Sequence, residues 1–253
     1  MMKTLARLVL ALCMAASFAT PVAADAMRIH TVSAPGLTWL PEPPGPTPTA
    51  AVRCSDATWG RLADRFTVAG MPALQRMELV TGGMPANLDA SAVWSALSQA
   101  GRTWNDEAND CGRPDRSGFG FWLAGARTAM STITYDGVNT VRFSSNLCEQ
   151  RTHVACILLQ SDPETGKPQG WDIVLDPLYP WGTSAGPWLD LRAVLTHELG
   201  HAIGLADQGR SATTCDPRRA SLTMFSCTWP GDTVKRTLAL GDALGVEGVS
   251  SGA

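Results

Sequence analysis

Two histidines and a glutamate interrupt an otherwise apolar stretch in the C-terminal third of the chain. In AVLTHELGHAIGLADQ, residues 193–208, His197 and His201 are four positions apart. Residues at i and i+4 of an α-helix share one face, so both imidazoles can point at a single metal ion. Glu198 would lie beside that ion, where its carboxylate can accept a proton from a water molecule attacking a carbonyl group. The spacing therefore predicts a hydrolytic zinc site with Glu198 as general base.

The pattern contains two histidines, whereas a catalytic zinc normally takes three protein ligands. A buried histidine is more often a hydrogen-bonded core residue than a ligand, but two unpaired imidazoles and a carboxylate are costly in so apolar a helix. No histidine follows His201, and Asp207 lies six residues beyond it. Gly204 can end the helix in a left-handed conformation and turn the chain back. We therefore expect Asp207 to be the third ligand, with a cap of this turn as its alternative role.

The full pattern HELGHAIGLAD resembles the signature of the metzincin peptidases, in the variant with an aspartate as third ligand that is found in snapalysin-type enzymes. SLTMF, residues 221–225, resembles their methionine turn, which implies that Met224 lies beneath the metal. Segments at 136–144, at 171–181 and near the C-terminus resemble the matrixin branch. The resemblance covers about residues 71–253 and implies a zinc metalloendopeptidase that acts on a protein or peptide substrate.

The same resemblance implies an α+β catalytic domain with a twisted, mostly parallel five-stranded sheet, an active-site helix, a methionine turn and a C-terminal helix. THVACILLQ, residues 152–160, would be the edge strand, and its unpaired backbone groups would hold an extended substrate. The wall of the substrate pocket would come from Phe225 to Pro230, including Trp229.

The sequence departs from the matrixin pattern in two ways. The stretch between Asp207 and Met224 is longer than usual, and the histidines of a second, structural zinc are missing. Calcium is a second cation to consider, and its candidate ligands are Asp162, Asp172 and Asp176. Solvated aspartates in turns and loops are the alternative interpretation.

The patterns along the chain lead independently to an α+β domain. Residues 75–81 have the composition of a strand, and residues 87–108 carry the apolar spacing of a helix that Asn87 or Asp89 can cap. Five short β-like runs follow before the histidine helix, and a final helix lies within 237–249. Strands followed by helices in this order are typical of α+β domains.

The N-terminal part of the chain indicates export. Residues 1–24 have a basic start, a short apolar run and small residues before the expected cleavage after Ala24, as in a secretory signal peptide. A lipoprotein box at Cys13 is a weaker alternative. No segment has the roughly 20 apolar residues of a membrane-spanning helix, so we expect no membrane span. Residues 25 to about 50 include PEPPGPTPT and should be extended and poorly ordered, with packed structure beginning later, and residues 25–70 form a proline-rich N-terminal segment that could be a propeptide or a linker.

The cysteines and the charge agree with an extracellular or periplasmic protein, expected to be a monomer. Beyond Cys13, an even number of cysteines remains, which indicates disulfides in an exported chain. Short loops favour Cys148–Cys156 and Cys215–Cys227, which leaves Cys54 with Cys111. The sequence RCSD around Cys54 also resembles the matrixin propeptide switch, although a disulfide is favoured. A net charge of −3 without a basic cluster argues against nucleic acid as a partner.

Two alternatives remain open. In one, a gluzincin-like site takes Glu247 or Asp242 as third ligand, although no matching acidic motif surrounds either residue. In the other, the protein is a secreted, disulfide-stabilised binding protein whose zinc is structural and which has no catalysis. The presence of Glu198, which binds no metal in the proposed arrangement, argues against the second alternative.

Overall fold

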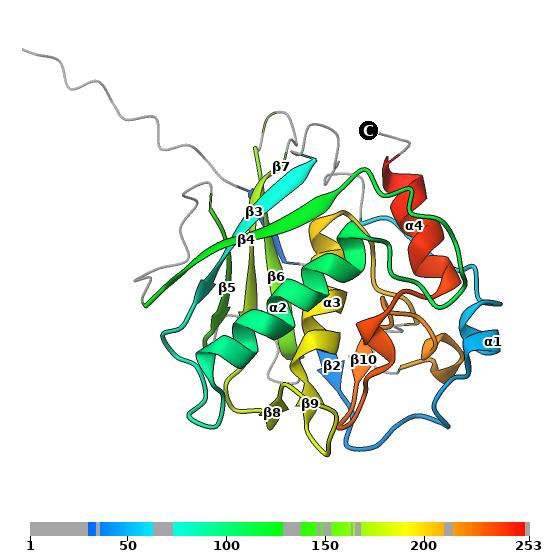
Figure 1. Ribbon diagram of the computed structural model, residues 1–253, viewed down its shortest axis with the longest axis horizontal. Coiled ribbons are helices and arrows are strands. Elements are labelled where there is room, and N and C mark those ends of the chain that lie inside the picture. Colours follow the sequence, from blue (N-terminus) through cyan, green and yellow to red (C-terminus); the bar gives the residue numbers. More distant parts are fainter. Residues whose placement is uncertain are drawn as a thin grey trace, which may run out of the picture.

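The chain folds around one large mixed sheet with helices packed against it (Figure 1). The computed structural model describes residues 30–33, 36–62, 73–128, 138–145, 148, 153–162, 164, 168–209 and 215–250. The strands are β1 (His30–Ser33), β2 (Leu37–Trp39), β3 (Leu74–Val80), β4 (Gly120–Arg127), β5 (Asn139–Phe143), β6 (His153–Ser161), β7 (Pro168–Leu175), β8 (Trp181–Gly182), β9 (Leu189–Asp190) and β10 (Cys227–Thr228). The helices are α1 (Ala50–Arg53), α2 (Ala90–Asn105), α3 (Leu191–Ala202) and α4 (Leu240–Ser250), with short 3-10 turns at Pro217–Arg219 and Val234–Arg236.

The main sheet has eight strands in the order β10-β2-β6-β7-β5-β3-β4, and β1 also pairs with β6. The ladders that join β7, β5, β3 and β4 are parallel, whereas β6 runs antiparallel to β7, β2 and β1. The α+β class expected from the sequence is confirmed. The expected five-stranded sheet is wrong, because strands from the N-terminal segment and β10 extend it.

The strand expected at the edge, residues 152–160, is an interior strand. β6 lies between β7 on one side and β1 and β2 on the other, and every residue of it is buried. The expectation that packed structure begins only after the proline-rich stretch is also wrong, because β2 comes before PEPPGPTPT and belongs to the main sheet. Leu37 of β2 is fully buried in the main core, and Arg53 of α1 is buried as well.

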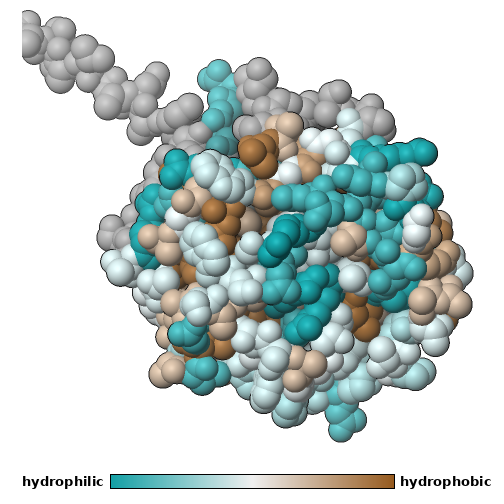
Figure 2. Space-filling view, viewed as in Figure 1, coloured by the Kyte–Doolittle hydropathy of each residue, from teal (hydrophilic) through white to brown (hydrophobic). Residues whose placement is uncertain are grey.

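Helices α2 and α3 pack against each other on the same side of the sheet (Figure 1). Asp89 caps α2 by accepting hydrogen bonds from the amides of Ser91 and Ala92, as one of the two candidate caps predicted. The indole of Trp104 on α2 donates to the carbonyl oxygen of Thr196 on α3 over 2.7 Å. Hydrophobic colour on the face shown in Figure 2 is limited to small separate spots. The apolar side chains of both helices are thus directed into the core, which fixes α3 against β6.

Most of the predicted elements are found close to their expected bounds. β3, α2 and α4 lie within two or three residues of the segments predicted as a strand and two helices. The β-like run at 130–136 and the signal peptide at 1–24 fall outside the described residues. Within the described part of the chain, no helix has the length and apolar character needed to cross a membrane.

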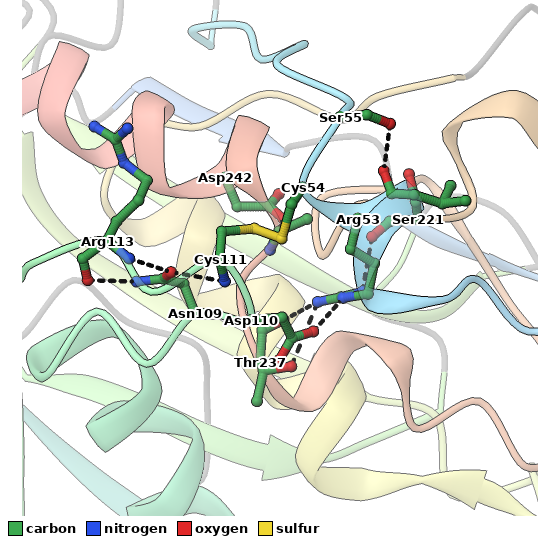
Figure 3. Close-up of a disulfide and its surroundings, with 12 residues drawn as sticks. Arg53, Cys54, Ser55, Asn109, Asp110, Cys111, Arg113, Ser221, Thr237 and Asp242 are labelled. Atoms are coloured by element: carbon green, nitrogen blue, oxygen red, sulfur yellow. Dashed lines mark hydrogen bonds and ion pairs between the residues drawn. A yellow bond between two sulfur atoms is a disulfide. The ribbon is translucent and has the colours of Figure 1, made fainter.

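Three disulfides join the cysteines in the pairs favoured by the sequence. They are Cys54–Cys111, Cys148–Cys156 and Cys215–Cys227. The first attaches the segment after α1 to the loop after α2 (Figure 3). Cys54 is therefore committed to Cys111, and its alternative role as a switch ligand is wrong. Three disulfides are compatible with an exported protein.

Candidate metal centre

The helix that carries the two histidines ends where the sequence predicts. Asp190 caps the N-terminus of α3 by accepting a hydrogen bond from the amide of Ala193 over 2.9 Å. At the other end, the amide of Leu205 bonds to the carbonyl oxygen of Gly200, and Gly204 adopts a φ of 90°. This left-handed conformation is open to glycine without strain. It stops the helix and turns the chain back, so that Asp207 reaches the histidine face.

The structure brings His197, His201 and Asp207 together. One possible ligand atom from each lies within 4.8 Å of the others, and no other such group of three occurs in the described ranges. The Nε2 atom of His197 lies 3.2 Å, and that of His201 3.5 Å, from Oδ1 of Asp207. Both imidazoles are fully buried, and 6% of the Asp207 side chain is exposed. This group could hold a metal ion.

Each imidazole uses its Nδ1 atom for a hydrogen bond to the backbone, so its Nε2 atom faces Asp207. His197 Nδ1 lies 2.9 Å from the carbonyl oxygen of Thr223, and His201 Nδ1 lies 2.8 Å from that of Leu205. A carbonyl oxygen only accepts, so both Nδ1 atoms carry a proton, and in the neutral form of each imidazole the Nε2 atom is an acceptor. Neither Nε2 atom nor either oxygen of Asp207 has a hydrogen-bond partner. Acceptors that converge without a donor are satisfied by a cation, so these residues fit a metal ion.

A proton is the competitor of that cation. Burial alone would lower the pKa of His201, but the charge of Asp207 outweighs it and raises this pKa to about 9. Burial lowers the pKa of His197. Burial also opposes ionisation of Asp207, yet the charge of His201 prevails and holds the pKa of the carboxyl well below its usual range. Without a metal, the centre therefore keeps a proton on His201 and a charge on Asp207.

Glu198 is buried next to the ligand group without belonging to it. Its side chain is fully buried, and neither carboxylate oxygen has a hydrogen-bond partner. Burial raises the pKa of Glu198 to about 8. A buried carboxylate without a donor is costly, so a structural role gives no reason for it. In its ionised form, which a neighbouring metal ion would favour, this carboxylate can accept a proton from a neighbouring molecule.

Met224 packs against the helix that carries the two histidines. A side-chain carbon added at Gly200 of α3 would lie 2.2 Å from the Met224 sulfur, so this methionine packs directly against the helix between the two histidines. The methionine turn at residues 221–225 stays a prediction. A side-chain carbon at position 200 would also lie 2.8 Å from the Trp104 ring, so the Met224 and Trp104 side chains would both have to move.

Asp242 supports the same turn and was not predicted in this role. Its carboxylate accepts hydrogen bonds from the backbone amides of Thr223, Met224 and Ala239, at 2.8, 3.0 and 2.9 Å. The carbonyl of Thr223 in turn orients His197. Asp242 is thus a residue that positions the centre, and it is not the third ligand of the gluzincin-like alternative. Glu247, the other candidate in that alternative, pairs with Arg113.

The predicted calcium ligands do not form a metal group in the described part of the chain. Asp172 accepts hydrogen bonds from Thr140 and Gln160 inside the sheet. One oxygen of Asp162 and one of Asp176 bond to backbone amides within their own turns. These aspartates therefore act as hydrogen-bond acceptors in the structure.

The segment predicted to form a pocket wall, residues 225–230, contains β10, and residues 225–229 are buried. Phe225 and Trp229 lie with ring centroids 6.4 Å apart. The Nζ atom of Lys235 lies 5.3 and 5.1 Å from the centroids of these rings and 2.7 Å from Asp232. Lys235 is a fully buried cation that the sequence did not reveal, because nothing local distinguishes it from a surface lysine.

The chemistry of this centre is assigned from its own residues. The residues that the sequence predicted as ligands converge, and the predicted general base lies beside them. No protein-family model matches the sequence, and no curated protein matches it at a significant level.

Proposed function

We propose that the protein is a secreted zinc-dependent metalloendopeptidase of the metzincin type, similar to the matrixins. The observation that carries the proposal is the convergence of His197, His201 and Asp207, whose facing atoms have no hydrogen-bond partner. Two imidazoles and a carboxylate are a ligand set of catalytic zinc sites, whereas calcium and magnesium take oxygen ligands. Three ligands leave the fourth position of a tetrahedral zinc for water or substrate.

In this proposal three residues bind the metal and Glu198 transfers the proton. His197, His201 and Asp207 hold the ion. When bound, zinc supplies a Lewis acid that polarises the scissile carbonyl group and favours deprotonation of the attacking water. A carboxylate oxygen of Glu198 accepts the proton of that water and later gives it to the leaving amine. Burial makes Glu198 a stronger base than an exposed glutamate, which suits this transfer.

The alternative is a disulfide-stabilised binding protein with a structural zinc. Structural zinc sites are usually closed by four protein ligands, and this group has three among the residues that the structure describes. A structural site also gives no use to Glu198, which is fully buried and unpartnered beside the ligands. Both points favour the catalytic reading of the centre.

The test of the proposal is metal-dependent cleavage of a denatured protein by the exported chain. We expect zinc to bind in a ratio of about one per chain, and cleavage to stop with a chelator and return with zinc but not with calcium. A peptide library would then distinguish internal cleavage from removal of terminal residues. Cleavage that survives removal of all zinc would contradict the proposal.

A further inference from the structure

Residues 59–62, which we call the bracing segment, lie alongside the turn that ends the histidine helix. The amide of Leu62 donates to the carbonyl of Gly204 over 2.9 Å, and the carbonyl of Gly60 accepts from the amide of Ala206 over 2.9 Å. These two hydrogen bonds enclose an isolated antiparallel β-bridge. The bracing segment is therefore joined by its backbone to the beginning and to the end of the turn.

The braced turn connects two of the candidate ligands. Leu205, which is the bridged residue of the turn, accepts a hydrogen bond from Nδ1 of His201 at its carbonyl oxygen over 2.8 Å. Gly204 before it has the left-handed conformation that turns the chain back, and Ala206 after it immediately precedes Asp207. The bracing segment thus bonds to the residues on both sides of the carbonyl that orients one ligand, and the second of these residues is next to the other ligand.

The same turn is held from its far end by the residues around Met224. The amide of Gln208 donates to the carbonyl of Met224 over 2.7 Å, and the carbonyl of Gln208 accepts from the amide of Ser226 over 3.0 Å. Asp207 therefore lies between two backbone attachments, one to the bracing segment and one to residues 224–226.

A turn that is fixed before the metal binds should raise the metal affinity. Ordering a loop costs conformational entropy for each residue that is fixed, and this cost weakens binding when the ligand itself must order the loop. A binding group on a loop also needs more support from its surroundings than one on a helix. His197 and His201 lie on α3, whereas Asp207 lies outside any helix or strand. Asp207 is thus the ligand that depends most on the attachments of the turn.

We propose that the bracing segment positions His201 and Asp207 before the metal binds and thereby raises the zinc affinity of the centre. Its residues act through the backbone of the turn, so they are positioning residues and not ligands. The inference rests on the proposed function, to which it adds a support of the metal centre that lies far away in the sequence.

The bracing segment has attachments of its own that do not involve the metal. The ring of Trp59 occupies the space that a side chain at Gly248 of α4 would need. The guanidinium of Arg61 donates to the carbonyl of the same Gly248 and lies 5.9 Å from the centroid of the Trp59 ring. A few residues earlier, Cys54 bonds the chain to the loop after α2 (Figure 3). The segment is therefore fixed to α4 and to the rest of the fold, and it can hold the turn in place.

A matched pair of variants at Leu62 isolates the hydrogen bond to Gly204. Leu62→Pro removes the donating amide, whereas Leu62→Ala removes most of the side chain and keeps the amide. Zinc affinity, measured by competition with a chromogenic chelator, should be about tenfold or more weaker in Leu62→Pro than in Leu62→Ala, as is typical when a group that orients a metal ligand is lost. Equal zinc affinity of the two variants would overturn the proposal.

Cobalt(II) in place of zinc separates a positioning role from a merely structural one. Its visible absorption depends on the number and arrangement of the ligand atoms. Leu62→Ala should keep the cobalt spectrum of the unmodified chain, whereas Leu62→Pro should change it because Asp207 is held less firmly. A merely structural role would lower the stability of the metal-free protein and leave the cobalt spectrum as it was. An unchanged spectrum in Leu62→Pro would contradict the positioning role.

A pair of glycine variants tests the same contact if Leu62→Pro does not fold. A side-chain carbon at Gly60 would lie 3.1 Å from Nε2 of Gln208 and 3.7 Å from Cβ of Ala206, whereas one at Gly45 would meet nothing within 4 Å. Gly60→Val should therefore push the bracing segment away from the turn and weaken zinc binding about tenfold. Gly45→Val should leave zinc binding unchanged. Equal zinc affinity in these two variants would likewise contradict the proposal.

Hydrogen exchange on the metal-free protein separates this inference from the proposed function. The amide of Ala206 should exchange faster in Leu62→Pro and Gly60→Val than in their matched controls, whether or not the protein is a peptidase. Faster exchange and weaker zinc binding in a chain that cleaves no protein would retain the bracing segment and contradict the peptidase. Cleavage by the unmodified chain, with equal exchange and equal zinc affinity within each pair, would retain the peptidase and contradict the bracing role.

Discussion

The Nδ1 atom of His197 donates to the backbone carbonyl of Thr223 over 2.9 Å. The amide of the same Thr223 donates to Asp242 over 2.8 Å, so a carboxylate on α4 is linked through one residue to the candidate ligand on α3. Loss of a partner that orients a metal ligand typically lowers metal affinity by about 10- to 100-fold.

Asp242→Ala should destabilise the protein and weaken metal binding. It would leave three backbone amides without acceptors, which should cost about 3 kcal/mol of unfolding free energy. Zinc affinity should fall about tenfold or more as His197 loses its orientation. Denaturant unfolding and zinc titration measure the two effects. Glu247→Ala on the same helix removes a surface ion pair and should cost less than about 1 kcal/mol. Equal zinc affinity in the two variants would contradict the link from Asp242 to His197.

Asp207→Ala should release most of the zinc and abolish activity, because two imidazoles alone do not hold zinc tightly. Asp207→His should keep the metal, and the more positive centre should shift the acidic limb of the pH–rate profile downward. Metal analysis after gel filtration and pH–rate profiles give these results. Asp216→Ala removes a nearby carboxylate that pairs with Arg218 and should change neither quantity. Full zinc occupancy in Asp207→Ala would show that Asp207 caps the turn and does not bind the metal.

Zinc binding at neutral pH should release protons. Before the metal binds, His201 has a pKa of about 9 and Glu198 one of about 8, so both hold a proton at pH values below these pKa values. The ion requires a neutral imidazole, and its charge favours ionised Glu198, so affinity should weaken as the pH falls. Calorimetry in buffers with different ionisation enthalpies counts the protons. Binding heats that do not depend on the buffer would show that His201 is neutral before the metal arrives.

Loss of the Cys215–Cys227 disulfide should lower both stability and activity. The bond joins Cys215, which precedes the predicted methionine turn, to Cys227 of β10. Replacing both cysteines by serine should cost roughly 3 kcal/mol in the chain-entropy model. The pair Cys148–Cys156 closes a loop of similar length on β6, and its removal should reduce stability to a similar extent with a smaller effect on activity. Unchanged activity without Cys215–Cys227 would show that this bond does not support the centre.

The features that could be predicted from the sequence are local. The spacing of His197 and His201 follows from the helix period, and the turn at Gly204 follows from the conformations open to glycine. The cap at Asp89 and two of the disulfides depend on residues close together in the chain. In each case the physical cause lies within about one helical turn or one short loop.

The features that were missed depend on distant partners. β2 has three residues, too few for an alternating pattern, and its partners on β6 and β10 are far along the chain. Its insertion converted the expected edge strand into an interior one. As an aspartate, Asp242 was a possible metal ligand. Its partners are backbone amides, which cannot be recognised from residue types. Pairing of backbone groups across long separations therefore set the limit of the sequence analysis.

The central claim is that the metal centre hydrolyses peptide bonds with Glu198 as general base. Its most direct test measures zinc content and cleavage of a denatured protein on the same samples of the unmodified chain and of Glu198→Gln. We predict about one zinc per chain in both samples and a rate in Glu198→Gln that is lower by about a hundredfold or more. Equal rates at equal zinc content would contradict the account.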